Sequence, residues 1–286
     1  MFGKTISGLL FFIFYCNLVF CGIAWGQALP SSVIEGDLEA VRRLIARGAS
    51  VNTVEEYGVS PLHLAAKAGH HDIAALLLEK GAKANAEVEN GWTPLHYAAE
   101  EGHQSVCVLL ISQGANVNAR IRSVRFSGYT PLHLAVINNR DEVVELLIKH
   151  GVEVNEQRMN YQTPLHLAVI ANNPRVVQVL LEQKADLNAW NQSGNSPLHL
   201  AADSGNADIV SLLLKHGAAV NGLSLRGVAP LHLAVVKNRL EVIEVLLQNQ
   251  AEVNLWDKDD QTPLKIALQR GTERIIELLQ KYGGRE

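Results

Sequence analysis

The sequence has few cysteines and no strong excess of either charge. Three cysteines occur among 286 residues. Cys16 and Cys21 lie in an apolar N-terminal segment, so the rest of the chain keeps only Cys107 and cannot form an internal disulfide. Lysine and arginine number 25 against 29 aspartate and glutamate residues. A chain so close to neutral has no overall attraction to nucleic acids or anionic membranes, and we expect neither as a partner.

The sequence also lacks the short motifs that mark common catalytic and metal sites. It contains no nucleophile elbow, no phosphate-binding P-loop, no pair of metal-spaced cysteines and no H-E-x-x-H helix. Cys107 stands in an apolar stretch, where a small buried thiol is its ordinary role. We therefore expect no enzymatic activity, no cofactor and no metal.

Residues 1–26 have the composition of an export signal. Lys4 supplies a positive charge ahead of a nearly unbroken apolar run from Leu9 to Phe20, and small Ala24 and Gly26 precede Gln27. This pattern predicts a signal peptide that is cleaved on export. The run is short for a membrane span, which needs about 20 residues, but a retained anchor is the alternative if the run is continued to Trp25. The protein is therefore expected to be periplasmic or secreted, or else anchored to a membrane by this segment alone.

One six-residue phrase recurs seven times after this segment. The first copy, S-P-L-H-L-A, starts at Ser60, and the later copies start at Thr93, Thr130, Thr163, Ser196, Ala229 and Thr262. The steps between copies are 33 residues except for one step of 37, which lies between Thr93 and Thr130. A fixed period of this length is the signature of a repeat protein, whose units each contact only their neighbours.

A 33-residue period that carries T-P-L-H-x-A resembles the ankyrin repeat, and the resemblance covers residues from about Pro30 to Tyr282. It implies an all-α solenoid in which each repeat is a β-turn finger followed by a helix-turn-helix. The expected organisation is an N-terminal capping half-repeat at 27–56 and seven ankyrin repeats within 57–286. These repeats are expected at about 57–86, 90–119, 127–156, 160–189, 193–222, 226–255 and 259–283.

The local residue types suit this architecture. In the second repeat Gly91 can take the positive φ of a turn, Thr93 can cap the first helix, and Pro94 fits its first position. Glycine or asparagine ends most helices, as expected for a left-handed terminator. Lys184 and Gln250 break that pattern at the ends of two second helices, and each is expected to cost about 1 kcal/mol.

Six of the eleven histidines stand in the repeated phrase, one per repeat: His63, His96, His133, His166, His199 and His232. The resemblance implies a structural role for them, in which each imidazole hydrogen-bonds groups that join one repeat to the next. Neighbouring copies are expected about 10 Å apart, the spacing of packed helices, which is too far for shared zinc ligation.

The resemblance also implies that partners bind the concave face made by the fingers and first helices. The residues there that do not belong to the framework are aromatic, aliphatic and basic, types that are enriched at the centre of protein interfaces. The predicted partner-binding residues are Trp92, Arg120, Arg122, Arg125, Phe126, Tyr129, Ile137, Arg158, Met159, Ile170 and Trp190. Because four arginines gather here between acidic fingers, the expected partner is a protein with an acidic patch, bound across the second to fifth repeats.

The sequence thus predicts an exported, non-enzymatic ankyrin scaffold that mediates protein–protein interaction. Two alternatives remain open at this point. One is a secreted effector that binds a host protein, and the other is an auxiliary factor that supports a periplasmic enzyme.

The first testable prediction concerns the N-terminus. Export is expected to remove residues up to about Gly26, because an apolar run and small residues precede Gln27. N-terminal sequencing or intact mass of the native protein measures this directly. A mature chain that still begins at Met1 would identify the segment as an anchor instead.

Overall fold

The computed structural model describes residues 28–123 and 126–286. The predicted signal segment and Arg125 therefore lie outside the described residues. Within the described part the secondary structure is helical, with one short 3-10 turn, η1 (Glu56–Gly58), and no strand. The prediction of an all-α solenoid is confirmed. No helix in this part is long and apolar enough to cross a membrane.

The helices form two parallel columns. The first helices of the repeats are α2 (Ala28–Glu35), α4 (Pro61–Ala68), α6 (Pro94–Glu101), α8 (Pro131–Ile137), α10 (Pro164–Ile170), α12 (Pro197–Ser204), α14 (Pro230–Val236) and α16 (Pro263–Arg270). The second helices are α3 (Leu38–Ala46), α5 (His71–Glu79), α7 (Gln104–Ser112), α9 (Asp141–Lys149), α11 (Pro174–Glu182), α13 (Ala207–Lys215), α15 (Leu240–Gln248) and α17 (Glu273–Lys281).

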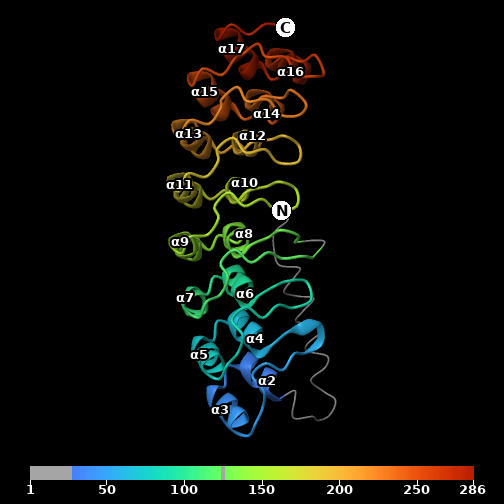
Figure 1. Ribbon diagram of the computed structural model, residues 1–286. Coiled ribbons are helices and arrows are strands. Elements are labelled where there is room, and N and C mark those ends of the chain that lie inside the picture. The colour runs from blue at the N-terminus through green and yellow to red at the C-terminus, as the bar shows by residue number, and fades with distance from the viewer. Residues whose placement is uncertain (1–27, 124–125) are drawn as a thin grey trace.

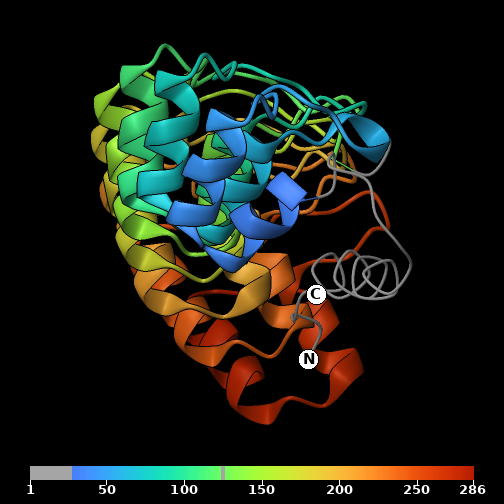
Figure 2. The ribbon, with the colours of Figure 1, turned by 90° about the horizontal axis from the view of Figure 1, so that it is seen from below.

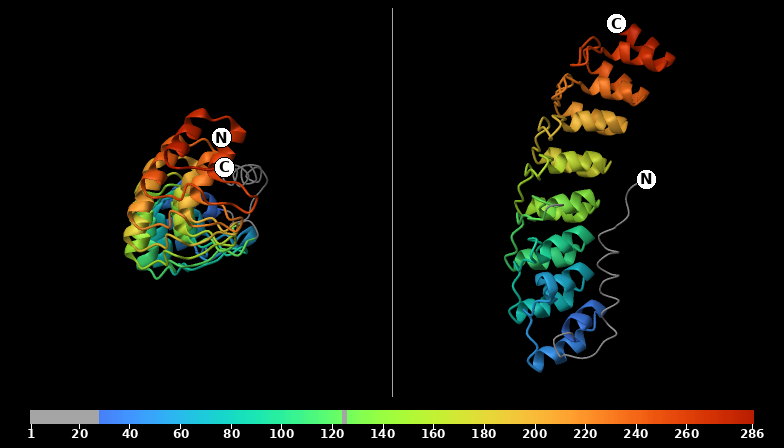
Figure 3. Two further views of the ribbon diagram at one scale, coloured as in Figure 1. Left: turned by 90° about the horizontal axis from the view of Figure 1, so that it is seen from above. Right: turned by 90° about the vertical axis from the view of Figure 1, so that its right-hand side faces the viewer.

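The repeats stack one on another from the α2–α3 pair to the α16–α17 pair (Figure 1). The second helices form the left column, the first helices lie beside them, and loops project on the right. We call these loops fingers 1 to 7: residues 52–59, 85–92, 118–129, 155–162, 188–195, 221–228 and 254–261. Successive repeats are turned slightly relative to one another, as the view along the stack shows (Figure 2). The side view separates the repeats into layers (Figure 3).

A histidine hydrogen bond links five of the repeats to the next finger. In the second repeat, His96 Nδ1 accepts from the Thr93 backbone N–H at 3.1 Å. Because a neutral imidazole then carries its proton on the other nitrogen, Nε2–H donates to the Ala119 carbonyl at 3.1 Å. The same link joins His63 to Ala86, His166 to Asn195, His199 to Val228 and His232 to Leu255. The predicted structural role of these histidines is confirmed, with one exception: the buried His133 Nε2 has no hydrogen-bond partner.

A second link runs through the asparagine that begins each finger. Asn85 Nδ2–H donates to the Gly114 carbonyl at 2.8 Å, and its Oδ1 accepts from the Asn116 backbone N–H at 2.7 Å. The Asn52 and Asn254 side-chain amides donate in the same way to the carbonyls of Gly81 and Gly283. Each asparagine therefore satisfies orphan groups at the end of the following helix pair, which such ends require.

Backbone hydrogen bonds close the fingers and join several of them to their neighbours. Within finger 2, the Val88 backbone N–H donates to the Trp92 carbonyl at 3.0 Å. Between fingers, the Glu89 N–H donates to the Tyr57 carbonyl at 2.9 Å, and the Gln192 N–H to the Asn160 carbonyl at 3.0 Å. Each finger follows the stacked helices of its repeat, so equivalent finger positions are about 10 Å apart.

The predicted left-handed helix ends are present. Lys184 has φ +60° and Gln250 has φ +65°, while Gly217 and Gly151 hold the same place in other repeats at φ +93° and +75°. A side chain in this region costs about 1–2 kcal/mol because its Cβ approaches the following carbonyl oxygen. These two second-helix ends therefore carry backbone strain that the glycine-ended repeats do not.

Replacing Lys184 or Gln250 with glycine is expected to raise the free energy of unfolding by up to about 1 kcal/mol. Relief of the strain outweighs the extra entropy of glycine in the unfolded chain, which costs roughly 0.5–1 kcal/mol. The matched control, Gly217→Ala, is expected to lower it by about 1 kcal/mol, although no atom lies within 4 Å of the added methyl. Urea denaturation measures all three, and a clear loss of stability in either glycine variant would contradict this account.

Candidate protein-binding face

The fingers and the adjoining side of the first helices present one surface, which we call the finger face (Figures 1 and 3). Four of the predicted apolar partner-binding residues are exposed there. Ile137 ends α8 and Ile170 ends α10, with 39% and 50% of each residue exposed, while Met159 in finger 4 is 68% exposed and Trp190 in finger 5 is 59% exposed. Large apolar side chains with this much exposure are available to a partner.

Two predicted contact residues are instead buried, and the prediction is wrong for them. Trp92 is 5% exposed and Tyr129 is 6% exposed. Phe126 is half-buried between them, with its ring centroid 5.8 Å from Trp92 and 5.5 Å from Tyr129, and Trp92 also packs on Tyr97 at 4.8 Å. The rings of fingers 2 and 3 pack on one another, because the residue directly before the capping threonine points into the stack.

The arginines of finger 3 form ion pairs with neighbouring fingers. An Arg120 amino nitrogen lies 2.5 Å from a Glu156 carboxylate oxygen, and Arg122 pairs with Glu87 of finger 2. The sequence analysis treated the acidic fingers as separate from this basic cluster. The structure joins them, so much of the expected positive potential is balanced within the chain.

The remaining arginine of this region serves packing. The Arg158 guanidinium carbon lies 4.9 Å from the centre of the Tyr129 ring, a cation–π geometry. Its amino group also donates to the Gln162 side chain. Arg158 therefore helps to cover the buried tyrosine, while Arg125 lies outside the described residues.

Finger 3, which is four residues longer than the others, keeps their hydrogen bonds. The Ile121 N–H donates to the Tyr129 carbonyl at 2.9 Å, and the Arg122 N–H to the Asn90 carbonyl of finger 2 at 2.8 Å. On the other side, the Met159 N–H donates to the Ser127 carbonyl at 3.1 Å. Ile121 is only 1% exposed and holds the place of Val88, which closes finger 2 through the same hydrogen bond. The framework contacts of finger 3 are thus kept on both sides, and its extra residues come after Arg122.

Other exposed apolar side chains lie on the later fingers. Tyr161, Leu223, Leu225 and Trp256 are not among the predicted partner-binding residues, but all four are 44–56% exposed. Leu225 and Trp256 are recognisable in the sequence as apolar finger residues, whereas Leu223 is found from the repeat register, because Trp190, Leu223 and Trp256 are 33 residues apart and hold the same place in fingers 5, 6 and 7.

The buried side chains have the electrostatics of a packed framework. Burial lowers the pKa of His63, His96 and His133 from 6.5 to about 4, so all three are neutral at pH 7. Burial raises the pKa of the Cys107 thiol to about 12, which keeps it protonated and unreactive. Within the described ranges, no group of three or more histidine, cysteine or acidic side chains could hold a metal ion.

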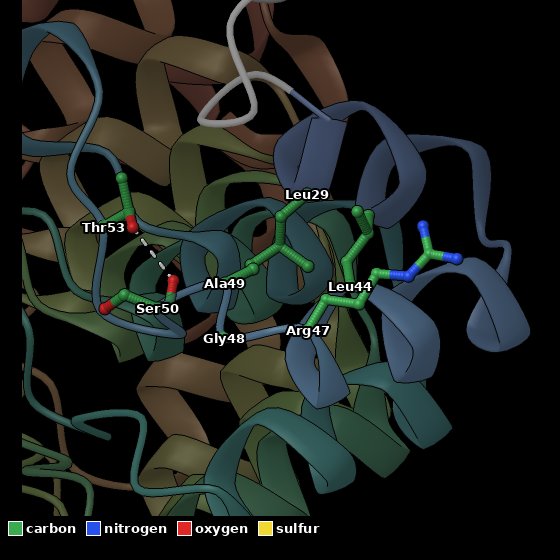
Figure 4. A pocket seen from close by; sticks show the side chains of 7 residues that line it. All are labelled: Leu29, Leu44, Arg47, Gly48, Ala49, Ser50 and Thr53. Carbon is green, nitrogen blue, oxygen red and sulfur yellow. Dashed lines mark hydrogen bonds between the residues drawn. The ribbon is translucent and has the colours of Figure 1, made fainter.

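A cavity of about 350 Å³ lies at the N-terminal end of the stack. Leu29, Leu44 and Ala49 supply its apolar side, and the Thr53 hydroxyl donates to the Ser50 carbonyl at 3.0 Å (Figure 4). The Arg47 guanidinium points away from this space. α2 and α3 form the N-terminal helix pair of the described stack, and no charged groups converge in this cavity.

The fold and the finger face define a helical-repeat scaffold with an extended binding surface. Two family models match the chain. One is described as "Ankyrin repeats (3 copies)" and matches residues 30–121 and 154–224, and the other as "Ankyrin repeats (many copies)" and matches residues 95–148 and 231–280. The chain belongs to the ankyrin-repeat family, and its architecture is that of a protein–protein interaction scaffold.

Known proteins resemble parts of this chain. The human Notch-regulated ankyrin repeat-containing protein is 46% identical over 50 residues, which are 18% of this chain and 44% of that protein. Human protein phosphatase 1 regulatory subunit 27 is 42% identical over 50 residues, or 18% and 32% of the two chains. The chain thus spans less than half the length of these curated relatives. The human ASB11 ankyrin repeat domain superposes with TM-score 0.70 and 32% identity over 78% of this chain and 98% of its own.

The neutral histidines predict a strong dependence of stability on pH. Since their folded pKa values of about 4 lie below 6.5, the unfolded chain binds protons first as pH falls. Their stabilisation is complete above pH 6.5 and is lost progressively as pH falls towards 4, at about 1.4 kcal/mol per pH unit for each histidine. Urea denaturation of the wild type and His96→Gln at pH 5, 6 and 7 measures this slope. The variant should show a slope smaller by about 1.4 kcal/mol per pH unit, and equal slopes would contradict the assignment.

Proposed function

We propose that this chain is an exported, non-enzymatic scaffold that binds a protein partner through the finger face. Export rests on the composition of residues 1–26. Binding rests on one observation: large apolar side chains, Ile137, Met159, Ile170 and Trp190, stand exposed on this face. Large apolar side chains exposed on the face that carries the fingers support an interaction surface.

The fold does not require apolar residues at these places. Ile137 and Ile170 occupy the position that holds Lys67, Glu100 and Asp203 in the first helices of other repeats. A position that accepts lysine and carboxylates in the same framework has no core to fill. Isoleucine at positions 137 and 170 is therefore not needed for folding, which supports a role in contact with a partner.

The expected acidic patch on the partner also belongs to this proposal. The side chains of Arg120 and Arg122 are 58% and 66% exposed in their pairs with Glu156 and Glu87. Exposed ion pairs are worth about 0–1 kcal/mol. A partner carboxylate can therefore replace Glu87 or Glu156 at little cost, although the apolar anchors supply most of the binding energy. A host protein and a periplasmic enzyme both fit this description of the partner.

Charge introduced on the first helices is expected to abolish partner binding without loss of fold. The variant Ile137→Glu with Ile170→Asp copies the residues that Glu100 and Asp203 supply in other repeats. Crosslinking in the native compartment, followed by quantification of each recovered protein, should show at least a tenfold loss, because a charge must be desolvated against the partner's apolar surface.

The control variant is Val108→Gln, which changes an exposed apolar residue on the second helix α7, away from the finger face. It should recover the wild-type partners in full. If the doubly charged variant melts like the wild type and also recovers the same proteins in the same amounts, the finger face is not the binding surface.

A further inference from the structure

Fingers 5 to 7 carry a line of exposed apolar side chains, which we call the apolar row: Trp190, Leu223 and Trp256. Each is at least 44% exposed, and they occupy the same place in three successive fingers. Leu225, which is 56% exposed, stands two residues after Leu223 on finger 6. Leu225 stands in the turn closed by the Gly227 N–H donating to the Ser224 carbonyl, and it adds to the exposed apolar surface of finger 6.

Folding does not explain the tryptophans. The equivalent residues of fingers 2 and 4 are Glu87 and Gln157, both exposed. The position therefore points to solvent throughout the array and accepts polar side chains without loss of the finger. Neither tryptophan is part of the core, and their one ring contact within the described residues is Lys265 over Trp256 at 5.8 Å. Tryptophan is among the residue types most enriched at binding hot spots.

The spacing of the row follows from the stacking of the repeats. Finger 5 closes through the Asn191 N–H donating to the Asn195 carbonyl at 3.1 Å, and finger 6 through the Ser224 N–H donating to the Val228 carbonyl at 2.9 Å. Packed helices lie about 8–10 Å apart, so equivalent residues of successive fingers are separated by about 10 Å. An α-helix rises about 10.5 Å in seven residues and returns to nearly the same face. The row and a heptad-patterned helix therefore have matching periods.

The charge around the row changes from finger to finger. Fingers 5 and 6 carry one charged residue, Arg226, whose guanidinium lies 2.5 Å from the Asp259 carboxylate of finger 7. Finger 7 is charged: Asp257, Lys258, Asp259 and Asp260 follow Trp256, and the Lys265 ammonium lies 5.8 Å from the centre of its ring. An amphipathic helix suits this mixture, because its apolar stripe can cover the row while its polar flanks face the charges of finger 7.

We propose that the apolar row is the docking surface for an amphipathic helix of the protein partner, with apolar residues repeating every seven positions. This inference rests on the proposed scaffold function and adds the class of partner element that it binds. Helices bind grooves and faces through regularly spaced apolar anchors of this kind.

The test uses defined peptides and the full exported chain. The probe is a neutral, fluorescently labelled helical peptide three heptads long, with leucine at the first and fourth position of each heptad. One control peptide has the same composition in scrambled order, and another has a polyproline backbone with leucine at every third residue. Fluorescence anisotropy should give saturable binding of the heptad peptide and at least tenfold weaker binding of both controls.

Matched variants locate the site. Trp190→Gln and Trp256→Gln introduce the residue that Gln157 supplies in finger 4, and each should weaken binding of the heptad peptide about tenfold or more. Val54→Gln makes the same kind of change at the equivalent exposed position of finger 1 and should leave binding unaltered. Thermal melts identical to the wild type establish that each variant is folded.

Three results overturn the proposal: no saturable binding of the heptad peptide, equal binding by a folded Trp190→Gln, Trp256→Gln double variant, or tighter binding of the polyproline peptide. Failure here is distinguishable from failure of the scaffold function. If the heptad peptide does not bind but Ile137→Glu with Ile170→Asp still loses native partners, the scaffold stands and only the helical partner is rejected.

Discussion

The structure depends on one repeated hydrogen-bonded histidine. Its imidazole holds the start of its own helix through Nδ1 and the next finger through Nε2, as in His96 between Thr93 and Ala119. The ring is buried and neutral, since burial lowers its pKa to about 4. A buried polar ring is stabilising only when both nitrogens are satisfied, so this residue fixes the distance and angle between repeats. The regular spacing of every surface row follows from that geometry.

The repeated phrase was enough to predict the helices, the terminators and the role of the histidines. The left-handed φ values of Lys184 and Gln250 were predictable for the same reason, since the backbone of a repeat is fixed by its neighbours. The candidate site was less predictable. Trp92 and Tyr129 look like surface aromatics in a finger, but the alternation of side chains along a hairpin turns them into the stack. Only the three-dimensional register separates them from exposed Trp190.

The site in finger 3 was also only partly predictable. Its arginines predicted a basic binding surface, but Arg120 and Arg122 pair with Glu156 and Glu87 of neighbouring fingers. Contacts between repeats are set by stacking and are invisible in the local sequence. Ile170 and Leu223 stand at exposed positions where other repeats have polar or charged residues. An apolar side chain at such a position is not explained by folding, and we interpret it as a contact for a partner.

The central claim is that partners bind the exposed apolar residues of the finger face. The most direct measurement is site-specific photo-crosslinking in the native compartment, with a photoreactive amino acid at Leu225 on finger 6 and, separately, at Val108 on α7. The account predicts a discrete crosslinked protein from position 225 and none from position 108. Crosslinks of equal yield from both positions, or from position 108 alone, would contradict it.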